Sequence, residues 1–338
     1  MNDLILIPED DAYDRTKYLG GSNAAAVMGL GAYGNTPLTC YLAKIGEGAE
    51  EIDPKRELFL QRRKRWEGPI IEMLREEFDA EIVGVNRRYR DREHAFLAAE
   101  IDFEWRDADG SIQNGEIKTV SPFAFGERDG WGEAGSADIP VHYAAQVMHG
   151  LGLTGRQTCI VAAMVGLDSM IFYRVERDDE TIAALRDQMV RFWINNVLAR
   201  VPPEPVSLAD VMRLTLRMRG RPVDADESLL ANLDSLAHIR GSMAAMDGEK
   251  DELMFKIGLS ILKQWGIPAP ALTDKGAIDP AQVGDNALIL SAGKQVASWN
   301  LQSTTRVDSK RLREEAPEIF TKFSKTTPSR TLRFKKQK

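Results

Sequence analysis

The sequence predicts an α/β fold in which helices flank a mixed central β-sheet, followed by a mostly helical C-terminal extension. Three observations predict it. Helical patterns fill most of the first eighty residues, period-two patterns run from about residue 80 to 120, and a helix, two strands and another helix follow up to about residue 200. Helices and strands in this order are typical of a sheet covered by helices.

Two short helices are expected near the N-terminus. Ser22 stands at an N-cap position before the alanine run 24–26, where its hydroxyl can accept a hydrogen bond from a free backbone N–H of the first turn. Thr36 plays the same part for a second helix, with Pro37 at the first helical position, which needs no backbone donor. We therefore expect helices that begin directly after residues 22 and 36.

A longer helical stretch is expected over residues 54–79. Gly68-Pro69 interrupts the pattern, so Pro69 is expected to begin a second segment with Glu72 at the edge of its apolar stripe. Residues 61–66, Gln-Arg-Arg-Lys-Arg-Trp, place four consecutive basic side chains before that segment. Such a cluster can neutralise phosphates even on a chain that is acidic overall.

Period-two patterns predict three strands, at residues 81–90, 96–105 and 112–120. The second strand is expected to place Ile101, Phe103 and Trp105 on one face. An Asp109-Gly110 turn separates it from the third strand, so these two strands should pair as a hairpin. The hairpin would bring polar residues of the two strands close together.

The second half of the core is expected to contain a helix, two strands and a further helix. Asp138 is expected to cap the first helix, with Pro140 just inside it. The other three elements are expected at residues 158–166, 170–176 and 178–200. The pattern thus completes a mixed sheet with helices on it.

Residues 200–207, Arg-Val-Pro-Pro-Glu-Pro-Val-Ser, form the clearest linker in the chain. We expect a core domain over residues 1–202 and an extension over residues 203–338. The extension should hold a helix at about 225–265, a strand pair at 287–301 and a basic tail at 322–338, in which the alternation of Leu332 and Phe334 with basic residues predicts a strand.

Composition excludes several classes of protein. The 338 residues carry a net charge of −7 and only two cysteines, Cys40 and Cys159, far apart in the sequence, so a disulfide framework or a zinc site is not expected. No apolar run approaches the ~20 residues that cross a bilayer, and the first residues lack the basic start of a secretion signal. We expect a cytoplasmic protein without a membrane partner.

Polar residues at the ends of these elements suggest a catalytic site. Asp102 and Glu116 would face each other across the hairpin, with Lys118 beside them and Gln146 on the following helix. A divalent cation, Mg²⁺ or Mn²⁺, would relieve the repulsion between two carboxylates, and the backbone carbonyl of Ile117 is a further ligand for it. Lys118 could stabilise a hydroxide or the charge on a phosphate, so the set suits phosphodiester hydrolysis.

Each of these residues has a plainer interpretation when it is taken alone. Glu116 and Lys118 could be a solvated ion pair, Asp102 a surface carboxylate and Gln146 a helix-surface amide. Glu72 lies among charged neighbours, as on an ordinary helix. Trp66 and Trp105 are expected in the core. Trp131, in a polar glycine-rich loop, is the best candidate for stacking on bases.

These residues, in this order, resemble the YqaJ-type viral recombinase family, whose best-known relative is phage lambda exonuclease. The family belongs to the PD-(D/E)xK nuclease superfamily. The resemblance spans roughly residues 12–195. It rests on the Gly-Gly-Ser-x-Ala-Ala-Ala opening at 20–26 with Gly29, on Glu67-Gly68, and on the ordered series of Asp102, "GEIKT" at 115–119 and "YAAQVMHGL" at 143–151.

The resemblance implies a restriction-endonuclease-like core and a 5′→3′ exonuclease that acts on double-stranded DNA ends. It implies that Asp102, Glu116 and Glu72 hold the metal, that Lys118 is the catalytic lysine, that Gln146 lies near the nucleophile, and that Arg15 and Ser22 hold the 5′-phosphate. It also implies a homo-oligomer, encoded by a phage or prophage, that prepares DNA ends for a single-strand annealing protein.

Three other functions remain open from the sequence. The protein could be an endonuclease or nickase of the same fold. It could bind DNA ends without cutting them, although three costly charges kept together count against this. It could also be a structural phage component that ignores both DNA and Mg²⁺.

Overall fold

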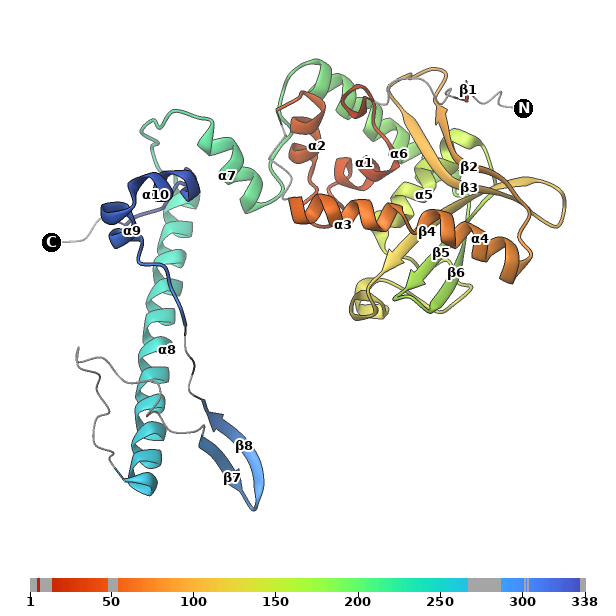
Figure 1. Cartoon of the computed structure of the whole chain (residues 1–338). Coiled ribbons are helices and arrows are strands. Elements are labelled where there is room, and N and C mark those ends of the chain that lie inside the picture. The colour runs from red at the N-terminus through yellow and green to blue at the C-terminus, as the bar shows by residue number, and fades with distance from the viewer. Residues whose placement is uncertain are drawn as a thin grey trace. The chain divides into compact units, whose positions relative to one another are not determined.

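The computed structural model describes residues 5–6, 14–47, 54–266, 287–300, 302 and 304–334. The chain divides into two compact units, one of residues 1–218 with 329–338 and the other of residues 219–328 (Figure 1). The first unit holds a mixed sheet flanked by helices, and the second is mostly helical with one strand pair. The expected fold class is therefore confirmed.

The first unit follows the expected order of elements. Its helices and strands are β1 (Ile5–Leu6), η1 (Arg15–Lys17), α1 (Gly21–Val27), α2 (Pro37–Lys44), α3 (Pro54–Lys64), α4 (Glu67–Phe78), β2 (Ile82–Arg90), β3 (Ala98–Arg106), β4 (Ile112–Val120), η2 (Pro122–Ala124), η3 (Glu127–Asp129), α5 (Val141–Thr154), β5 (Thr158–Val165), β6 (Ser169–Glu176), α6 (Asp179–Phe192), η4 (Trp193–Leu198) and α7 (Leu208–Leu216). Helix α7 was not predicted from the sequence.

The six strands of the sheet lie side by side in chain order, from β1 to β6. Only β4 and β5 pair in parallel, and every other neighbouring pair is antiparallel. The β3–β4 hairpin turns where expected, with Gly110 at a φ of +83°, which glycine adopts without strain. Helix α5 is the crossover that a parallel β4–β5 pair requires.

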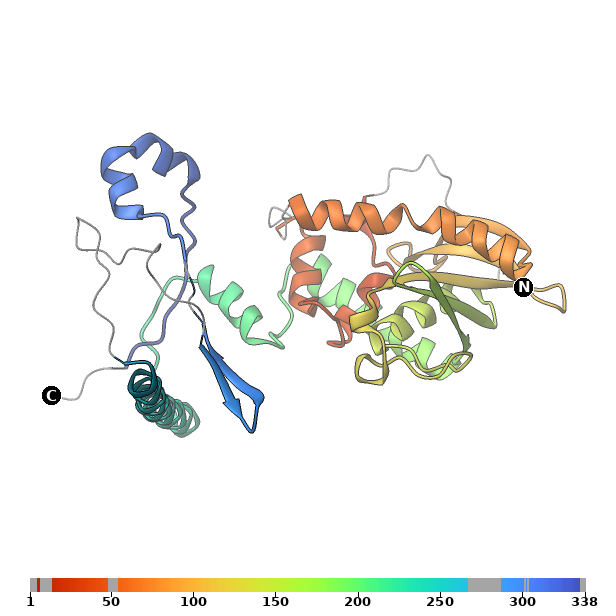
Figure 2. The same cartoon turned by 60° about the horizontal axis from the view of Figure 1, so that its bottom comes forward.

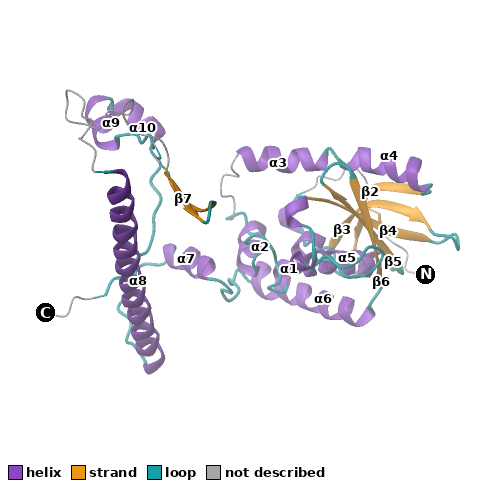
Figure 3. Ribbon diagram, turned by 90° about the horizontal axis from the view of Figure 1, so that it is seen from below, coloured by secondary structure: helices purple, strands orange, loops and turns teal. Residues whose placement is uncertain are grey.

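Helices cover both faces of the sheet (Figure 3). On one face, Ile70 and Leu74 of α4 pack against Phe103 and Ile117 of the hairpin. On the other face, α5 and α6 pack against β5 and β6. Helices α3 and α4 follow each other along one side of the sheet, as Figure 2 shows. Both faces of the hairpin are therefore buried by helices.

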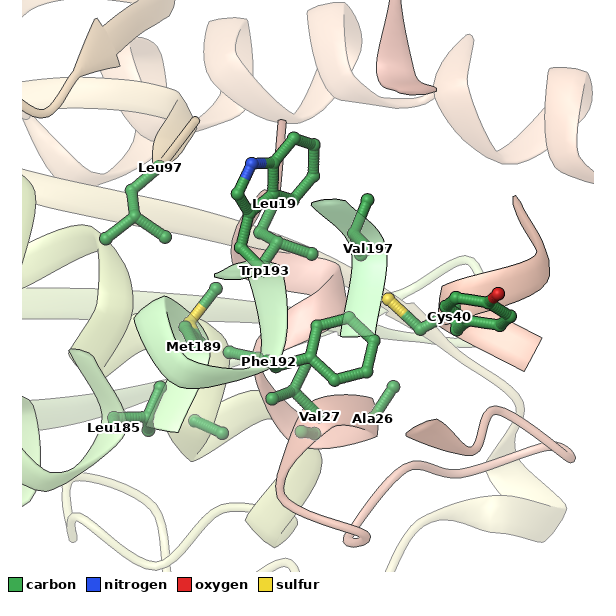
Figure 4. Close-up of a cluster of buried hydrophobic side chains, with 14 of the residues drawn as sticks. Leu19, Ala26, Val27, Cys40, Leu97, Leu185, Met189, Phe192, Trp193 and Val197 are labelled. Atoms are coloured by element: carbon green, nitrogen blue, oxygen red, sulfur yellow. The ribbon is translucent and has the colours of Figure 1, made fainter. Parts of the chain in front are cut away.

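A further apolar cluster joins α1, α2 and α6 into one layer (Figure 4). Leu19 and Leu97 connect this layer to the sheet, because the two residues form a parallel β-bridge. Phe192 and Met189 of α6 are buried against the alanine-rich α1. The small alanine side chains let α1 pack close to α2 and α6. This packing sets the position of the first residues of α1 relative to α5.

The start of α1 differs from the prediction. Gly20, not Ser22, is the N-cap, and the side chain of Asn23 accepts a hydrogen bond from the Gly20 N–H at 3.1 Å. Ser22 lies inside the first turn and is exposed. A Cβ on Gly21 would lie 2.9 Å from Cγ of Gln146. The glycine pair therefore lets the start of α1 press against α5 at Gln146.

The caps of the other helices follow the prediction in part. Thr36 caps α2 as expected, with Pro37 as its first residue. The expected cap at Asp138 is wrong, because Pro140 holds an extended backbone with a ψ of 134° and α5 begins only after it. The break between two helices in this region is confirmed, but α4 begins at Glu67, two residues before the expected Pro69.

Strand β3 does not alternate as its sequence predicted. Ile101 faces α5, since it lies 3.2 Å from the Cβ position of Gly150. Phe103 and Trp105 pack instead in the cluster around α4. The expected common face of these three residues is therefore wrong. Because the strand changes its alternation between Ile101 and Phe103, the intervening Asp102 lies at the point of the irregularity.

The tryptophans also differ from the prediction. Trp131 is 3% exposed and packs against Phe125, Tyr143 and Tyr173, so it does not stack on bases. Trp66 is 41% exposed rather than in the core. Aromatic rings in loops whose sequence is polar can still be buried by neighbouring segments, which the local pattern does not reveal.

The second unit contains the expected long helix and strand pair. Its elements are α8 (Glu227–Trp265), β7 (Ala287–Ser291), β8 (Lys294–Trp299), α9 (Ser309–Glu315) and α10 (Pro317–Phe323). Helices α9 and α10 were not predicted. The strand expected around Leu332 and Phe334 is wrong, because residues 324–334 form neither helix nor strand. The last four residues of the basic tail lie outside the described residues.

Gly115 should be the most sensitive glycine of the hairpin. A Cβ at this position would lie 2.2 Å from ring atoms of the buried Phe103. We expect Gly115→Ala to lower the free energy of unfolding by about 1–3 kcal/mol through overpacking, measured by urea denaturation. Gly68→Ala is the matched control, since nothing lies within 4 Å of its Cβ position. Equal stability of both variants would contradict this packing.

Candidate active site

Strand β4 and helix α5 hold three polar side chains in a closed hydrogen-bonded triangle. The ammonium of Lys118 donates to Glu116 Oε1 at 2.5 Å and to Gln146 Oε1 at 3.0 Å. The amide of Gln146 donates to the same Glu116 oxygen at 2.6 Å. The side chains of Glu116 and Lys118 are only 7% and 14% exposed. The interpretation of this pair as a solvated ion pair is therefore excluded.

Asp102 joins this triangle from strand β3. Its Oδ2 accepts a hydrogen bond from the backbone N–H of Ile117 at 2.8 Å, between Glu116 and Lys118. The irregularity of β3 at this residue turns the carboxylate toward β4. The structure thus brings together Asp102, Glu116, Ile117, Lys118 and Gln146, as the sequence analysis expected.

Burial and a neighbouring negative charge oppose the ionised form of Asp102. Burial raises the pKa of its carboxyl well above the usual range, and the charge of Glu116 raises it further. The ammonium of Lys118 and the N–H of Ile117 act in the other direction without cancelling these effects. Asp102 therefore lacks enough compensating positive charge in the protein alone.

Lys118 is the positive centre of the site. Burial by itself would lower the pKa of its ammonium, but the charges of Glu116 and Asp102 outweigh burial and raise it. The ammonium also lies 4.6 Å from the ring centroid of Tyr143, on α5. Lys118 is therefore protonated at neutral pH, which suits it to stabilise negative charge rather than to accept a proton.

A further carboxylate, Glu67, lies near these groups at the start of α4. Burial raises the pKa of its carboxyl, and the charges of Glu100 and Glu116 add to that effect against the opposing charge of Lys64. Glu67 and Asp102 also interact electrostatically. The sequence analysis did not select Glu67, although its position directly before Gly68, where the helix restarts, was the available signal.

The structure does not bring Glu72 to the other site residues. Its side chain is 60% exposed and pairs with Arg75 at 2.6 Å. Residues 67 and 72 are five positions apart, which corresponds to about 140° around a helix. Since both lie on α4, only one of them can face the hairpin, and the electrostatic coupling to Asp102 belongs to Glu67.

The two residues expected to hold a phosphate come from the N-terminal segment. Ser22 lies in the first turn of α1, whose preceding Gly21 approaches Gln146 within van der Waals distance. Arg15 lies in η1, where its backbone carbonyl accepts a hydrogen bond from Lys44 at 2.7 Å. Both side chains belong to exposed residues. Gly21 is the residue that approaches Gln146, whereas Ser22, the next residue, is exposed.

The carboxylates offer oxygen atoms that suit a divalent cation. Asp102 and Glu116 meet at the Ile117 backbone and the Lys118 ammonium, and hard divalent cations prefer such carboxylate oxygens. Raised pKa values at Asp102 and Glu67 show the shortage of positive charge that a bound cation would relieve. Within the described ranges, however, three acidic, histidine or cysteine side chains do not converge on one ready-made centre.

Aromatic and basic side chains surround the site. Arg63 of α3 donates to the backbone carbonyl of Thr119, one residue after Lys118. Tyr33, from the loop between α1 and α2, contacts His142 of α5 edge to face. Burial and the nearby charge of Lys118 lower the pKa of His142, which keeps its imidazole neutral. Positive charge at this end of the sheet is thus concentrated on Lys118 and Arg63.

Comparison with known proteins gives one match to a family. Residues 12–157 match the model of the YqaJ-like viral recombinase domain. The uncharacterized protein YqaJ of Bacillus subtilis (strain 168) is 24% identical over 326 residues, which cover 93% of this chain and 90% of that protein. The residues that match the family model include Glu67, Asp102, Glu116, Lys118 and Gln146.

Solved structures with some similarity include an alkaline exonuclease, LHK-Exo, from Laribacter hongkongensis. It is 19% identical, covers 55% of this chain and 91% of that chain, and superposes with a TM-score of 0.41. Its complex with dAMP gives 20% identity with the same coverage and TM-score. Separately, within the described residues none of the helices combines the length and apolar character needed to cross a membrane.

Asp102→Asn should stabilise the protein when divalent cations are removed. Because the folded-state pKa of Asp102 is raised, the folded protein loses stability as pH rises above about 4, the usual carboxyl value. The loss is about 1.4 kcal/mol for each unit by which the pKa is raised. We expect urea denaturation in chelator at pH 7.5 to show a gain for Asp102→Asn.

The matched control for this prediction is Asp109→Asn in the exposed hairpin turn. There, hydrogen bonds from Ser111 lower the pKa of the carboxyl, so loss of the charge should not stabilise the protein. A gain of equal size for both variants, or no gain for Asp102→Asn, would contradict the electrostatic description of the site.

Proposed function

We propose that this protein is a metal-dependent deoxyribonuclease, because residues 12–157 match the model of the YqaJ-like viral recombinase domain. Its substrate would be a double-stranded DNA end, from which it would hydrolyse phosphodiester bonds as an exonuclease. The observation that carries the proposal is the hydrogen-bonded cluster of the buried Glu116 with the half-buried Asp102, Lys118 and Gln146 inside this region. A recombinase-type domain acts on DNA, and this cluster has the groups that phosphodiester hydrolysis requires.

Asp102 and Glu116 from the hairpin would hold the cation, with the carbonyl of Ile117 as a further ligand. Glu67 of α4 does not converge with them in the described residues, and it would complete the set when the cation binds. A bound Mg²⁺ or Mn²⁺ ion supplies Lewis acidity and lowers the pKa of water. Glu67 takes the place that the resemblance gave to Glu72. The raised pKa values of Asp102 and Glu67 support this assignment, since burial and neighbouring carboxylates disfavour their anionic forms and a cation would offset that effect.

Lys118 would stabilise the negative charge that develops on the scissile phosphate. Its raised pKa keeps the ammonium charged, and its burial strengthens the interaction by excluding water. Gln146 would hold Glu116 and Lys118 in place, because its amide bonds to both. Arg15 and Ser22 would take the terminal 5′-phosphate, which would set a 5′→3′ direction. The close approach of α1 to Gln146 supports this role for Ser22.

In the cell, such an activity would expose single strands at a duplex end, on which a single-strand annealing protein could load. We propose a phage or prophage origin, action in the cytoplasm of a bacterial host and a homo-oligomeric state, all on the basis of the family resemblance. An endonuclease or nickase with the same site, or a protein that binds DNA ends without cutting, is the alternative that experiment must separate.

The test of this function uses a linear duplex labelled at one 5′ end and a closed circle of the same sequence. Purified protein is added with Mg²⁺, with Mn²⁺ or with chelator. We expect metal-dependent loss of the linear DNA and an intact circle, with the label released first if the direction is 5′→3′. Cutting of the circle would indicate an endonuclease, and binding without cutting of either DNA would indicate an end-binding protein.

Lys118→Ala is the matching variant for that assay. Removing one preorganised positive donor from such a site typically costs about 10²–10³-fold in rate, so cleavage should fall by at least that factor. DNA binding measured by anisotropy should persist, because the basic side chains at residues 62–65 would still attract the DNA backbone. Wild-type cleavage by Lys118→Ala would contradict the assignment of this lysine.

Glu67 and Glu72 provide a second, internally controlled test. Both are glutamates of α4, but Glu67 is coupled to Asp102 whereas Glu72 pairs with Arg75 in solvent. We expect Glu67→Gln to lose at least about tenfold in rate and to need more Mn²⁺, in line with the loss of one metal ligand. Glu72→Gln should keep wild-type rates and metal dependence. The reverse result would restore Glu72 as the ligand.

A further inference from the structure

We propose that Tyr33, supported by His142 and Tyr143, is a stacking site for the nucleobase next to the phosphate on which Lys118 acts. The proposal rests on the proposed function, since that function supplies the DNA strand. It deepens the function by assigning a base-binding surface to residues that have no part in the metal and phosphate chemistry described above.

A chain of ring contacts leads from the catalytic ammonium to the surface. The Lys118 ammonium lies 4.6 Å from the ring centroid of Tyr143, and the rings of Tyr143 and His142 are 4.0 Å apart between centroids. His142 in turn contacts Tyr33, with centroids 6.0 Å apart and ring planes at 86°. Tyr33 is 77% exposed, so its ring can receive another ring.

The backbone of the loop holds Tyr33 in an unusual conformation. Its φ of +58° lies in the left-handed region, which residues with a side chain rarely adopt. The loop around it is tight, since Asn35 N–H donates to the Ala32 carbonyl at 3.1 Å and a Cβ on Gly31 would lie 2.1 Å from the Asn35 carbonyl oxygen. Glycine would fit position 33 without strain. Since glycine would adopt this backbone more easily, the feature that tyrosine adds at position 33 is its aromatic ring.

The chemistry around Tyr33 matches a nucleotide rather than a peptide or an apolar surface. Lys118 and Arg63, the positive side chains here, both act on Tyr143 electrostatically and would attract a phosphate. An exposed aromatic ring stacks on any base because every base has a π-face. His142, kept neutral by burial and by Lys118, supports Tyr33 without adding charge under the base. The site would thus bind bases without sequence preference.

The contrast with Trp131 shows why the exposed ring matters. Trp131 was the expected stacking residue, but it is buried among Phe125, Tyr143 and Tyr173. Tyr143 therefore contacts a buried aromatic cluster through Trp131 and, through His142, the exposed Tyr33. The buried cluster fixes Tyr143, which in turn supports the rings that reach solvent.

The test measures binding of the full chain, in chelator, to an internally labelled duplex with two unpaired nucleotides on each strand at both ends. These nucleotides carry thymine in one DNA and no base in the other. Fluorescence anisotropy gives the dissociation constants. Because the end nucleotides are unpaired, a base can stack on the protein without the cost of opening a base pair. The abasic DNA keeps every phosphate, so the difference between the two DNAs reports the contribution of the bases alone.

We expect Tyr33→Leu to weaken binding of the thymine DNA by about 5- to 150-fold, the range for loss of one stacked base, and to leave the abasic DNA unchanged. Tyr33→Phe should bind like wild type. Tyr33→Gly, which relieves the backbone strain, should lose the same affinity as Tyr33→Leu while the fold is kept. Phe323→Leu, a control that is also 77% exposed, should bind both DNAs normally.

Several results would overturn the stacking site. These are unchanged binding of the thymine DNA by both Tyr33→Leu and Tyr33→Gly, equal losses on thymine and abasic DNA, or an equal loss for Phe323→Leu. In each of these results wild-type protein still binds DNA, so the proposed function is untouched. A wild-type protein that binds neither DNA would overturn the proposed function, and the stacking site with it.

Discussion

The structure of the first unit depends on the burial of two carboxylates, Asp102 and Glu116, beside a single lysine. Lys118 and Gln146 compensate Glu116 with two short hydrogen bonds, whereas Asp102 has one backbone N–H donor and a pKa held well above its usual range. Such an arrangement costs folding free energy unless something else compensates it. The helices and strands packed around these two carboxylates hold them in this arrangement despite that cost.

Strand β3 itself offers a comparison. Glu104, two residues after Asp102, is completely buried, yet it pairs with Arg156 at 2.7 Å and Arg87 at 3.3 Å and accepts a hydrogen bond from Tyr89. Two guanidinium groups thus offset its charge, although its Oε2 accepts no hydrogen bond from the described residues, and we assign it a structural role. Asp102 lies on the same strand but lacks a guanidinium of its own. Glu104 is fully buried and paired with guanidinium groups, whereas Asp102 is half-buried and has no guanidinium partner, within the part of the chain that the structure describes, that would offset its charge.

Close backbone approaches keep the cluster in place. Gly21 lets α1 press on Gln146, and Gly115 leaves room for Phe103 under the strand that carries Glu116. The irregularity of β3 turns Asp102 toward β4, where it meets the N–H of Ile117. Tyr143 then links the triangle to the aromatic cluster around Trp131. Precise positioning of polar groups therefore depends on apolar packing and on the absence of side chains at two positions.

The sequence by itself determined the order of elements up to about residue 200, the mixed sheet and the hairpin turn, and together with the family resemblance it indicated the residues that meet on β3, β4 and α5. These follow from local periodicity, turn chemistry and the fixed geometry of a hairpin, which act between residues near in sequence. Only the tertiary structure decided that Glu67 rather than Glu72 lies near Asp102, that Trp131 is buried, and that Tyr33 lies beside His142. The reason is physical: which face of α4 meets the sheet, and which loop covers which ring, are set by packing between segments far apart in the chain.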